Sequence, residues 1–263
     1  MAAFTIDPIP GAAWPAGRFG VLQATGAIGA ISHGVTTRDG PDFGDDADTD
    51  QCAAAASAAA TALGLADVAW VQQVHGGAVL RVGAGGLAGP ADALVTDTPG
   101  LAILGRSADC PLVLAAGQRR DGSWAVGFAH ASWRATVAGL TAAMLARLCG
   151  ELAVDPGTIR AVIAPCARVC CYEVGDEVRE IALAALGAGA GAFFRRPRPE
   201  ARWHFDLEAA NLSQLAAAGV AAARTATSGI CTICRGERFW SWRRQGAAAG
   251  RFAALIGVRT GAL

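Results

Sequence analysis

The sequence predicts an α/β protein that folds as a single domain over residues 1–263. Short apolar runs with the two-residue alternation of strands recur between Ala-rich segments with helical periodicity. Hydrophobic residues make up 53% of the chain and charged residues only 17%, so the chain can bury a sizeable core. No linker or internal repeat divides the 263 residues, a length that suits one large domain.

Up to residue 100 the sequence predicts strands at 20–24, 35–37 and 69–83 and a helix at 51–63. The second of these strands leads Arg38 into a turn formed by an Asp-Gly pair. The helix follows an acidic stretch, and negative charge is favourable at a helix N-terminus. His75 lies where a Gly-Gly pair interrupts the third strand, a position that suits either a structural histidine or a metal ligand.

The chain is organised around residues 101–140. Two apolar segments, 101–104 and 111–115, predict buried strand, and the polar interruption between them predicts a bulge that ends at Cys110. Bulges re-aim side chains, often next to active sites. We therefore expect Cys110 to be presented at the end of a strand.

The run 123–130 predicts a further strand that ends at His130, followed by a helix over 132–150 with Ser132 as its N-cap. A Cys and a His on separate strands can converge at one rim of a sheet, where binding sites are usually found. Cys110 and His130 are therefore the first candidate functional pair.

The last hundred residues predict a strand at 159–165, a helix ending near Ala185, a basic loop at 193–203, a helix at 205–220 and a final strand. The basic loop is expected to be a solvated loop. A nucleic-acid arm would carry interleaved stacking aromatics and an overall positive charge, which are lacking here.

The composition excludes several classes of function. All 22 basic residues are Arg, so catalytic lysines are excluded, and a phosphate must be bound by Arg, backbone N–H groups, His or metal. The formal net charge is zero, which argues against nucleic-acid or membrane-surface partners. No signal peptide or membrane span is recognisable, and eight Cys then indicate reduced thiols and a metal in the cytoplasm.

His75, Cys110 and His130 are the candidate ligands of one metal ion. They are far apart in the sequence, unlike the closely paired ligands of a zinc finger, but like the ligands of a catalytic zinc. One thiolate and two imidazoles suit zinc, and copper also binds such soft ligands.

Two alternatives use overlapping residues. Cys110 and His130 could form a metal-free nucleophile and base, with Asp109 or Asp92 orienting the imidazole. Alternatively, Cys231 and Cys234 have half-site metal or redox spacing, and Cys166, Cys170 and Cys171 could complete a structural zinc.

Several sequence blocks, taken together, resemble one family. In order they are HGVTTRDG, QVHG, ADALVT with PG, SADCP, AHASWR, IAPC with CYEVG, FDL with N and QL, and SWRR with GR. They span nearly the whole chain and resemble the bacterial laccase-domain or multicopper polyphenol oxidase family, now described as zinc-dependent purine nucleoside phosphorylases with adenosine deaminase activity.

The resemblance implies a single domain with a layered α/β/β/α sandwich of mixed sheets, and one zinc bound by His75, Cys110 and His130. It implies phosphorolysis of adenosine, inosine, guanosine and methylthioadenosine, and deamination of adenosine. A related type of member removes L-Ser from a UDP-muramoyl peptidoglycan precursor, and copper-dependent phenol oxidation has also been ascribed to the fold. The implied partners are a small nucleoside and phosphate, bound by a monomer or small homo-oligomer.

Within that family the remaining site residues are assigned by chemistry. Arg38 is the first candidate phosphate ligand and Arg243 the second, because no Lys is available. Asp109 is expected to orient a ligand, carry a proton in catalysis, or simply cap a helix. The chain departs from the family in HASWRA, where Ser132 and Ala135 replace glycines, in a shortened loop after Arg38, and in Trp242 where Tyr is usual.

Overall fold

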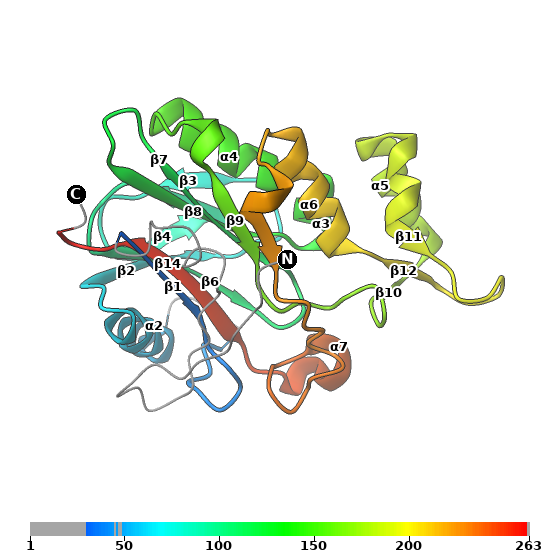
Figure 1. Ribbon diagram of the computed structural model, residues 1–263. Helices are drawn as coiled ribbons and strands as arrows, with labels where there is room; N and C mark the ends of the chain where they lie inside the picture. The colour runs from blue at the N-terminus through cyan, green and yellow to red at the C-terminus, as the bar shows by residue number, and fades with distance from the viewer. Residues whose placement is uncertain (1–29, 45, 47–48, 262–263) are drawn as a thin grey trace.

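A computed structural model describes residues 30–44, 46 and 49–261 of the chain (Figure 1). Two β-sheets lie face to face between two layers of helices, with α2 (Asp50–Ala62) outside one sheet and α4 (Leu140–Glu151) and α6 (Leu207–Ala217) outside the other. This is the expected α/β/β/α sandwich. The strand predicted at 20–24 lies outside the described residues.

The first sheet has five strands in the order β1 (Ile31–Val35), β14 (Phe252–Val258), β6 (Leu101–Ser107), β2 (Asp67–Gln72) and β4 (Gly86–Pro90). The sheet is mixed, as expected. Strand β14 is antiparallel to both of its neighbours, whereas β2 pairs in parallel with β6 and β4.

The second sheet has six strands in the order β13 (Thr225–Thr227), β9 (Arg160–Ile163), β7 (Leu112–Gln118), β8 (Trp124–His130), β5 (Ala93–Thr96) and β3 (Val79–Arg81). Its central pairs are antiparallel and its two edge pairs are parallel. A small third sheet, which packs with α5 (Asp176–Leu186), contains β10 (Glu173–Val174), β12 (Trp203–Phe205) and β11 (Phe194–Arg195).

The central strands are buried on both faces, which explains their continuous apolar runs. In β6, Leu101 and Ile103 face the space between the sheets, whereas Leu104 packs under α2. Gly105 is required in the same strand because a side chain there would collide with the ring of Phe128 from the opposite sheet. The two sheets therefore pack closely near the end of β6.

Three sequence predictions are corrected by the structure. The interruption before Cys110 is not a bulge, because β6 and β7 belong to different sheets and residues 108–111 cross between them. The strand predicted at 69–83 is likewise divided into β2 and β3, one in each sheet. The predicted helix 132–150 is two helices, α3 (Trp133–Val137) and α4, because Gly139 takes a left-handed conformation with φ of 77°.

Other predictions hold with small shifts of boundary. The Ala-rich helix is α2, and its N-cap is Thr49. The strand predicted at 35–37 overlaps β1 only at Val35, where β1 ends, whereas Arg38 lies in the predicted turn. The basic loop joins β11 to β12. Between the last loop and β14 lies a short helix, α7 (Trp242–Gln245). No helix in the described part of the chain combines the length and apolarity needed to cross a membrane.

Candidate metal centre and pocket

His75, Cys110 and His130 converge in the structure, and we call them the pocket centre. Each offers one ligand atom, and these atoms all lie within 4.8 Å of one another. The two imidazole rings meet edge to face, with centroids 4.9 Å apart and an interplanar angle of 78°. The three residues proposed from the sequence are therefore brought together by the fold.

His130 lies at the end of a strand, and His75 and Cys110 lie in segments that connect strands. His130 is the last residue of β8 and pairs with Leu112 of β7, so Cys110, two residues before Leu112, lies beside it. Cys110 belongs to the crossing from β6 to β7. His75 lies on the segment that leads from β2 to β3, which also passes from one sheet to the other.

Asp92 connects the two histidines. It is fully buried, and its Oδ1 lies 2.8 Å from Nδ1 of His130. Its carboxylate also accepts hydrogen bonds from the backbone N–H groups of Val74, His75 and Gly76 at 3.2, 3.0 and 2.7 Å. These bonds hold His75 in a left-handed conformation with φ of 57°. A carboxylate on Nδ1 leaves Nε2 of His130 available to bind metal.

The electrostatics of the pocket centre favour a thiolate. Burial opposes ionisation of Cys110, but the charge of His130 and hydrogen bonds with both imidazoles lower the pKa of the thiol to about 7. Burial likewise opposes a charge on His130, but the Cys110 thiolate and Asp92 raise its pKa to about 9. The thiolate is the form of cysteine that binds metal or acts as a nucleophile.

The donor set fits a catalytic metal ion. One thiolate and two imidazoles, with a buried carboxylate behind one imidazole, are typical of a zinc site that leaves a fourth position open. Copper accepts the same donors. The metal-free pairing of Cys110 with His130 uses the same contacts, and Asp92, not Asp109, is then the carboxylate that orients the imidazole.

The pocket centre faces a pocket of about 450 Å³, a volume in the range of small-ligand sites. Beyond the pocket centre, two aromatic and three Arg side chains contribute to its walls. The other lining residues are Gly44, Gln73, Arg106, Ser107, Ala108, Asp109, Tyr172, Trp242, Arg243 and Arg251. The mixture of apolar, cationic and metal-binding groups suits an organic anion or a nucleoside with phosphate.

Asp109 lines the pocket, and its carboxylate is fully engaged by protein groups. It accepts from Oγ1 of Thr232 at 2.6 Å, from Oγ of Ser241 at 3.0 Å and from the backbone N–H of Arg243 at 2.6 Å. The last two bonds anchor the start of α7. Asp109 has φ of 101°, a strained conformation for a residue other than Gly.

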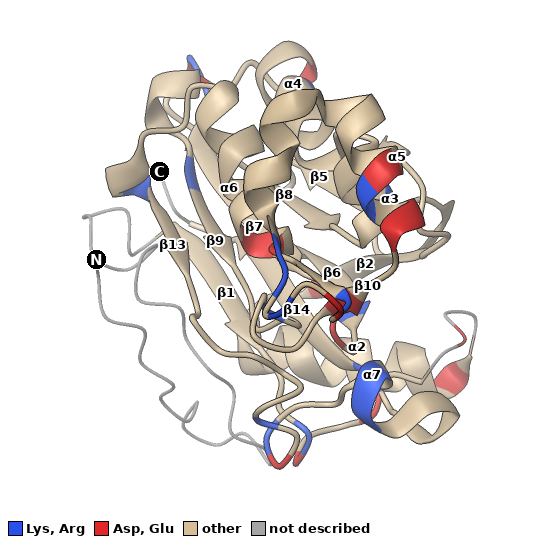
Figure 2. Ribbon diagram, turned by 90° about the vertical axis from the view of Figure 1, so that its right-hand side faces the viewer, with Lys and Arg blue, Asp and Glu red and all other residues tan. Residues whose placement is uncertain are grey.

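The two predicted phosphate ligands lie in different places. Arg243 lines the pocket, with its guanidinium 5.0 Å from the Tyr172 ring and donating to the Glu173 carbonyl. It belongs to α7, which is drawn blue because of its arginines (Figure 2). Arg38 is not among the lining residues. Its guanidinium stacks on Trp240 at 4.3 Å and donates to the Gly236 carbonyl.

Four side chains of the site were not assigned roles from the sequence. Arg106 lies near the end of β6 and Arg251 just before β14, and these strands are neighbours in the first sheet. Tyr172 lies in the loop before β10, and Trp242 is the first residue of α7. Tyr172 is the single tyrosine of the chain, and Trp242 is a large hydrophobic residue that is 48% exposed. The exposure of its apolar side chain is the signal that points to a role for Trp242, and only a structure reveals that exposure.

Comparison with known proteins finds relatives over most of the chain. The family described as multi-copper polyphenol oxidoreductase laccase matches residues 29–259. A purine nucleoside phosphorylase of Xylella fastidiosa (strain Temecula1) is 38% identical over 204 residues, 74% of each chain. Adenosine deaminase RL5, from an unknown prokaryotic organism, is 39% identical over 162 residues, 61% of this chain and 59% of that protein. The crystal structure of YlmD from Geobacillus stearothermophilus superposes with a TM-score of 0.80 at 27% identity, over 96% of this chain and 99% of that chain.

Proposed function

The chain belongs to the multi-copper polyphenol oxidoreductase laccase family, and from that premise we propose that it is a zinc-dependent purine nucleoside phosphorylase that also deaminates adenosine. The observation that carries this proposal is the pocket centre, which opens into a pocket large enough for a nucleoside and is lined by aromatic and Arg side chains. The names of the two similar enzymes support the two reactions.

Both reactions are substitutions in which atoms balance without a redox partner. In phosphorolysis, a phosphate oxygen bonds to the ribose C1′, the C1′–N9 bond breaks, and the purine leaves with its electron pair and takes up a proton. The products are a free base and ribose 1-phosphate. In deamination, water adds to C6 of adenosine, and ammonia leaves to give inosine.

His75, Cys110 and His130 would hold the zinc ion. A zinc ion bound there would supply Lewis acidity, which makes water a competent nucleophile near neutral pH. Asp92 would act as a positioning residue, because its bonds fix both the ring of His130 and the backbone of His75.

Cationic groups of the pocket would bind phosphate. Arg243 is the favoured ligand among the two predicted from the sequence because it lines the pocket. Arg106 and Arg251, which also line it, would add positive potential around the anion. Arg38 is an alternative ligand only if the loop that carries it moves toward the pocket, since it now stacks on Trp240.

The aromatic side chains would bind the purine. Trp242 lies at the wall with 48% of its surface exposed, and such a ring can stack on a base. Burial raises the pKa of Tyr172, so its hydroxyl stays protonated and can donate a hydrogen bond to substrate.

Asp109 was expected to serve as a catalytic residue next to Cys110, and that role stays a prediction. Its three accepted hydrogen bonds support a positioning role instead. By holding the first residues of α7, Asp109 would keep Arg243 and Trp242 at the pocket.

The decisive experiment is a product screen by mass spectrometry. The zinc-loaded protein is incubated with adenosine, inosine, guanosine, methylthioadenosine and UDP-muramoyl-serine, each with and without phosphate, and the copper-loaded protein with a phenol. Phosphate-dependent release of a free purine supports the proposal, together with its loss in Cys110→Ser. Serine release or phenol oxidation without any nucleoside turnover contradicts it, in favour of precursor editing or an oxidase. A covalent adduct at Cys110 with turnover in chelated protein would instead identify the metal-free nucleophile.

We further propose that the enzyme works in the reducing cytoplasm as a monomer or small homo-oligomer. All eight cysteines are free thiols in the structure, which supports a reducing compartment. Fractionation of cells and sedimentation of the purified protein test the two statements.

A further inference from the structure

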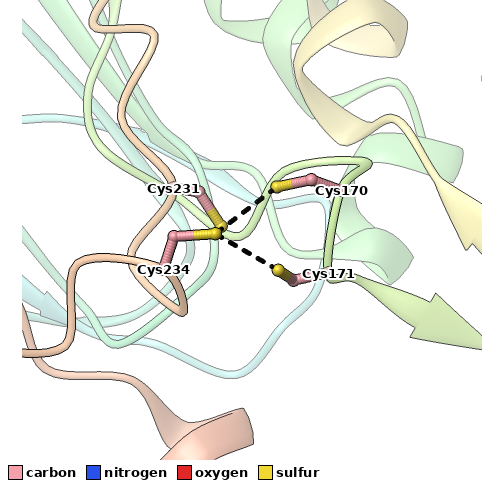
Figure 3. A group of neighbouring side chains, drawn as sticks. All are labelled: Cys170, Cys171, Cys231 and Cys234. Atoms are coloured by element: carbon pink, nitrogen blue, oxygen red, sulfur yellow. Dashed lines mark hydrogen bonds between the residues drawn. The ribbon is translucent and has the colours of Figure 1, made fainter.

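Four cysteines form a second group of metal-binding side chains outside the pocket. We call Cys170, Cys171, Cys231 and Cys234 the cysteine cluster (Figure 3). Their sulfur atoms all lie within 4.8 Å of one another. The Sγ of Cys234 lies 3.8 Å from that of Cys170 and 3.4 Å from that of Cys171. None of the four lines the pocket.

We propose that the cysteine cluster binds a structural zinc ion, distinct from the metal of the pocket centre. Tetrahedral zinc with Zn–S bonds of about 2.3 Å places its sulfurs about 3.8 Å apart, close to the separations seen here. The spacing suits a single ion, and a tetrahedral set of four sulfurs indicates zinc or iron. Four thiolates complete the coordination and leave no open position, as in structural zinc sites.

The local backbone supports the assignment. The backbone N–H groups of Arg168, Cys234 and Ile233 hydrogen-bond with the sulfur of Cys231. Two of these donors come from within the CTIC turn itself. The turn therefore aims N–H groups at the first sulfur, as backbone turns do around anionic ligands.

The cluster is made by two segments that are far apart in the sequence. One carries Cys170 and Cys171 after β9, and the other carries Cys231 and Cys234 before α7. Cys166, an expected ligand, is not a member. It is fully buried and contributes backbone only, through a parallel bridge with Cys231. That bridge aligns the two segments so that the four thiols meet.

A disulfide would use the cysteines less completely than a metal ion. It would join one pair and leave two further thiols crowded against it, whereas a divalent ion engages all four and offsets two of their four negative charges. Three of the four have solvent-accessible side chains, so an ion can enter without unfolding the core.

The cysteine cluster lies next to residues that form or support the wall of the pocket. Cys171 precedes Tyr172 of the pocket, and Cys231 precedes Thr232, which donates to Asp109. An ion bound by the cluster would fasten together the two loops that form one wall of the pocket. It would therefore act as a positioning element, with no direct contact with the reacting atoms.

The test is metal counting on the intact protein, purified in reductant without added metal. We expect about two zinc per chain in the wild type by inductively coupled plasma mass spectrometry. The double variant Cys170→Ser/Cys234→Ser should lose one zinc, and Cys149→Ser, a partly exposed thiol on α4 outside both groups, should lose none. A zinc content that is the same in the wild type and the double variant, or iron in place of the zinc that the double variant loses, overturns the proposal.

A second measurement remains informative if the double variant fails to fold. In Cys110→Ser the pocket centre is impaired, so the single remaining metal should be that of the cysteine cluster. Exchange of this metal for Co²⁺ should give the intense visible absorption of tetrahedral thiolate coordination. A colourless Co²⁺ form, or a disulfide in the cluster found by peptide mapping, contradicts the assignment. Because neither readout uses nucleoside turnover, failure of the proposed function would leave this test intact.

Discussion

The pocket centre and the cysteine cluster differ in what surrounds their ligand atoms. The pocket centre has three donors of two chemical types, a buried carboxylate behind one of them and a pocket in front. The cysteine cluster has four identical donors in loops, and none of them lines that pocket. An open, mixed donor set is typical of a catalytic ion, whereas a closed all-sulfur set is typical of a structural one. One kind of metal ion can thus be catalytic at one site and structural at another, and the number and surroundings of its ligands decide which.

The largest effect should come from removing a ligand of the pocket centre. In Cys110→Ser we expect nucleoside turnover to fall by more than about 100-fold. That is the loss produced when a residue that supports a metal ligand, and not the ligand itself, is removed. Thermal stability should fall only by the amount that binding of the pocket metal contributes, because the cysteine cluster keeps its ion. Product formation and metal content are measured on the same sample. Full activity in a variant that has lost the pocket metal would show that the metal of the pocket centre is not catalytic.

A smaller loss is expected when the carboxylate behind the pocket centre is neutralised. Asp92→Asn keeps the shape of the side chain but removes the charge that accepts from His130 and three backbone N–H groups. Metal affinity should fall by about 10- to 100-fold. Competition with a chromophoric chelator measures it. Asp121→Asn, at an exposed turn, is the matched control, and equal affinities in the two variants would refute the role of Asp92.

Binding of the purine should depend on the exposed indole at the pocket wall. Trp242→Ala should raise KM for the nucleoside by about 5- to 100-fold, because stacking of a base on an aromatic ring contributes about 1–3 kcal/mol. Trp242→Phe should recover most of the loss. Thermal stability should change little because about half of the residue is exposed, at 48%. Initial-rate kinetics decide the matter, and an unchanged KM in the Ala variant would exclude stacking.

The smallest effect on chemistry should come from the cysteine cluster. Cys171→Ser should lower the melting temperature by several degrees, as a loss of about 1–3 kcal/mol does in a chain of this size. It should raise KM for phosphate and nucleoside by only a few fold, through the pocket wall, and leave kcat nearly unchanged. Calorimetry and kinetics measure the two effects. A large fall in kcat with normal stability would assign the cluster to the reaction itself.

Much of the fold was predictable because its main elements carry local signals. The strand ending at His130 and the Ser132 cap follow from residues within a few positions of each other. The crossing before Cys110 was not predictable. Strands buried on both faces have the same apolar runs whether they share a sheet or face each other across two.

The three residues of the pocket centre could be predicted from the sequence, since each follows a strand-like run. Asp92 and Asp109 were both predicted as possible partners of His130, and the choice between them depends on which strands become neighbours: β5 pairs with β8, and this places Asp92 beside His130. The cysteine cluster was predicted only as one alternative, with Cys166 among its ligands. That Cys166 instead joins the two segments through its backbone bridge with Cys231 is something no local pattern reveals.

Residues 73–78 and 108–111 each pass from one sheet of the sandwich to the other, and each carries one ligand of the pocket centre. An ion bound by these two ligands and His130 would therefore link the two sheets at the pocket. Its binding would add to the free energy of unfolding in proportion to the logarithm of metal concentration over Kd. Removal of the ion by a chelator should destabilise these two crossing segments first. Their amide hydrogens should then exchange faster, while those of β6 and β7 stay protected.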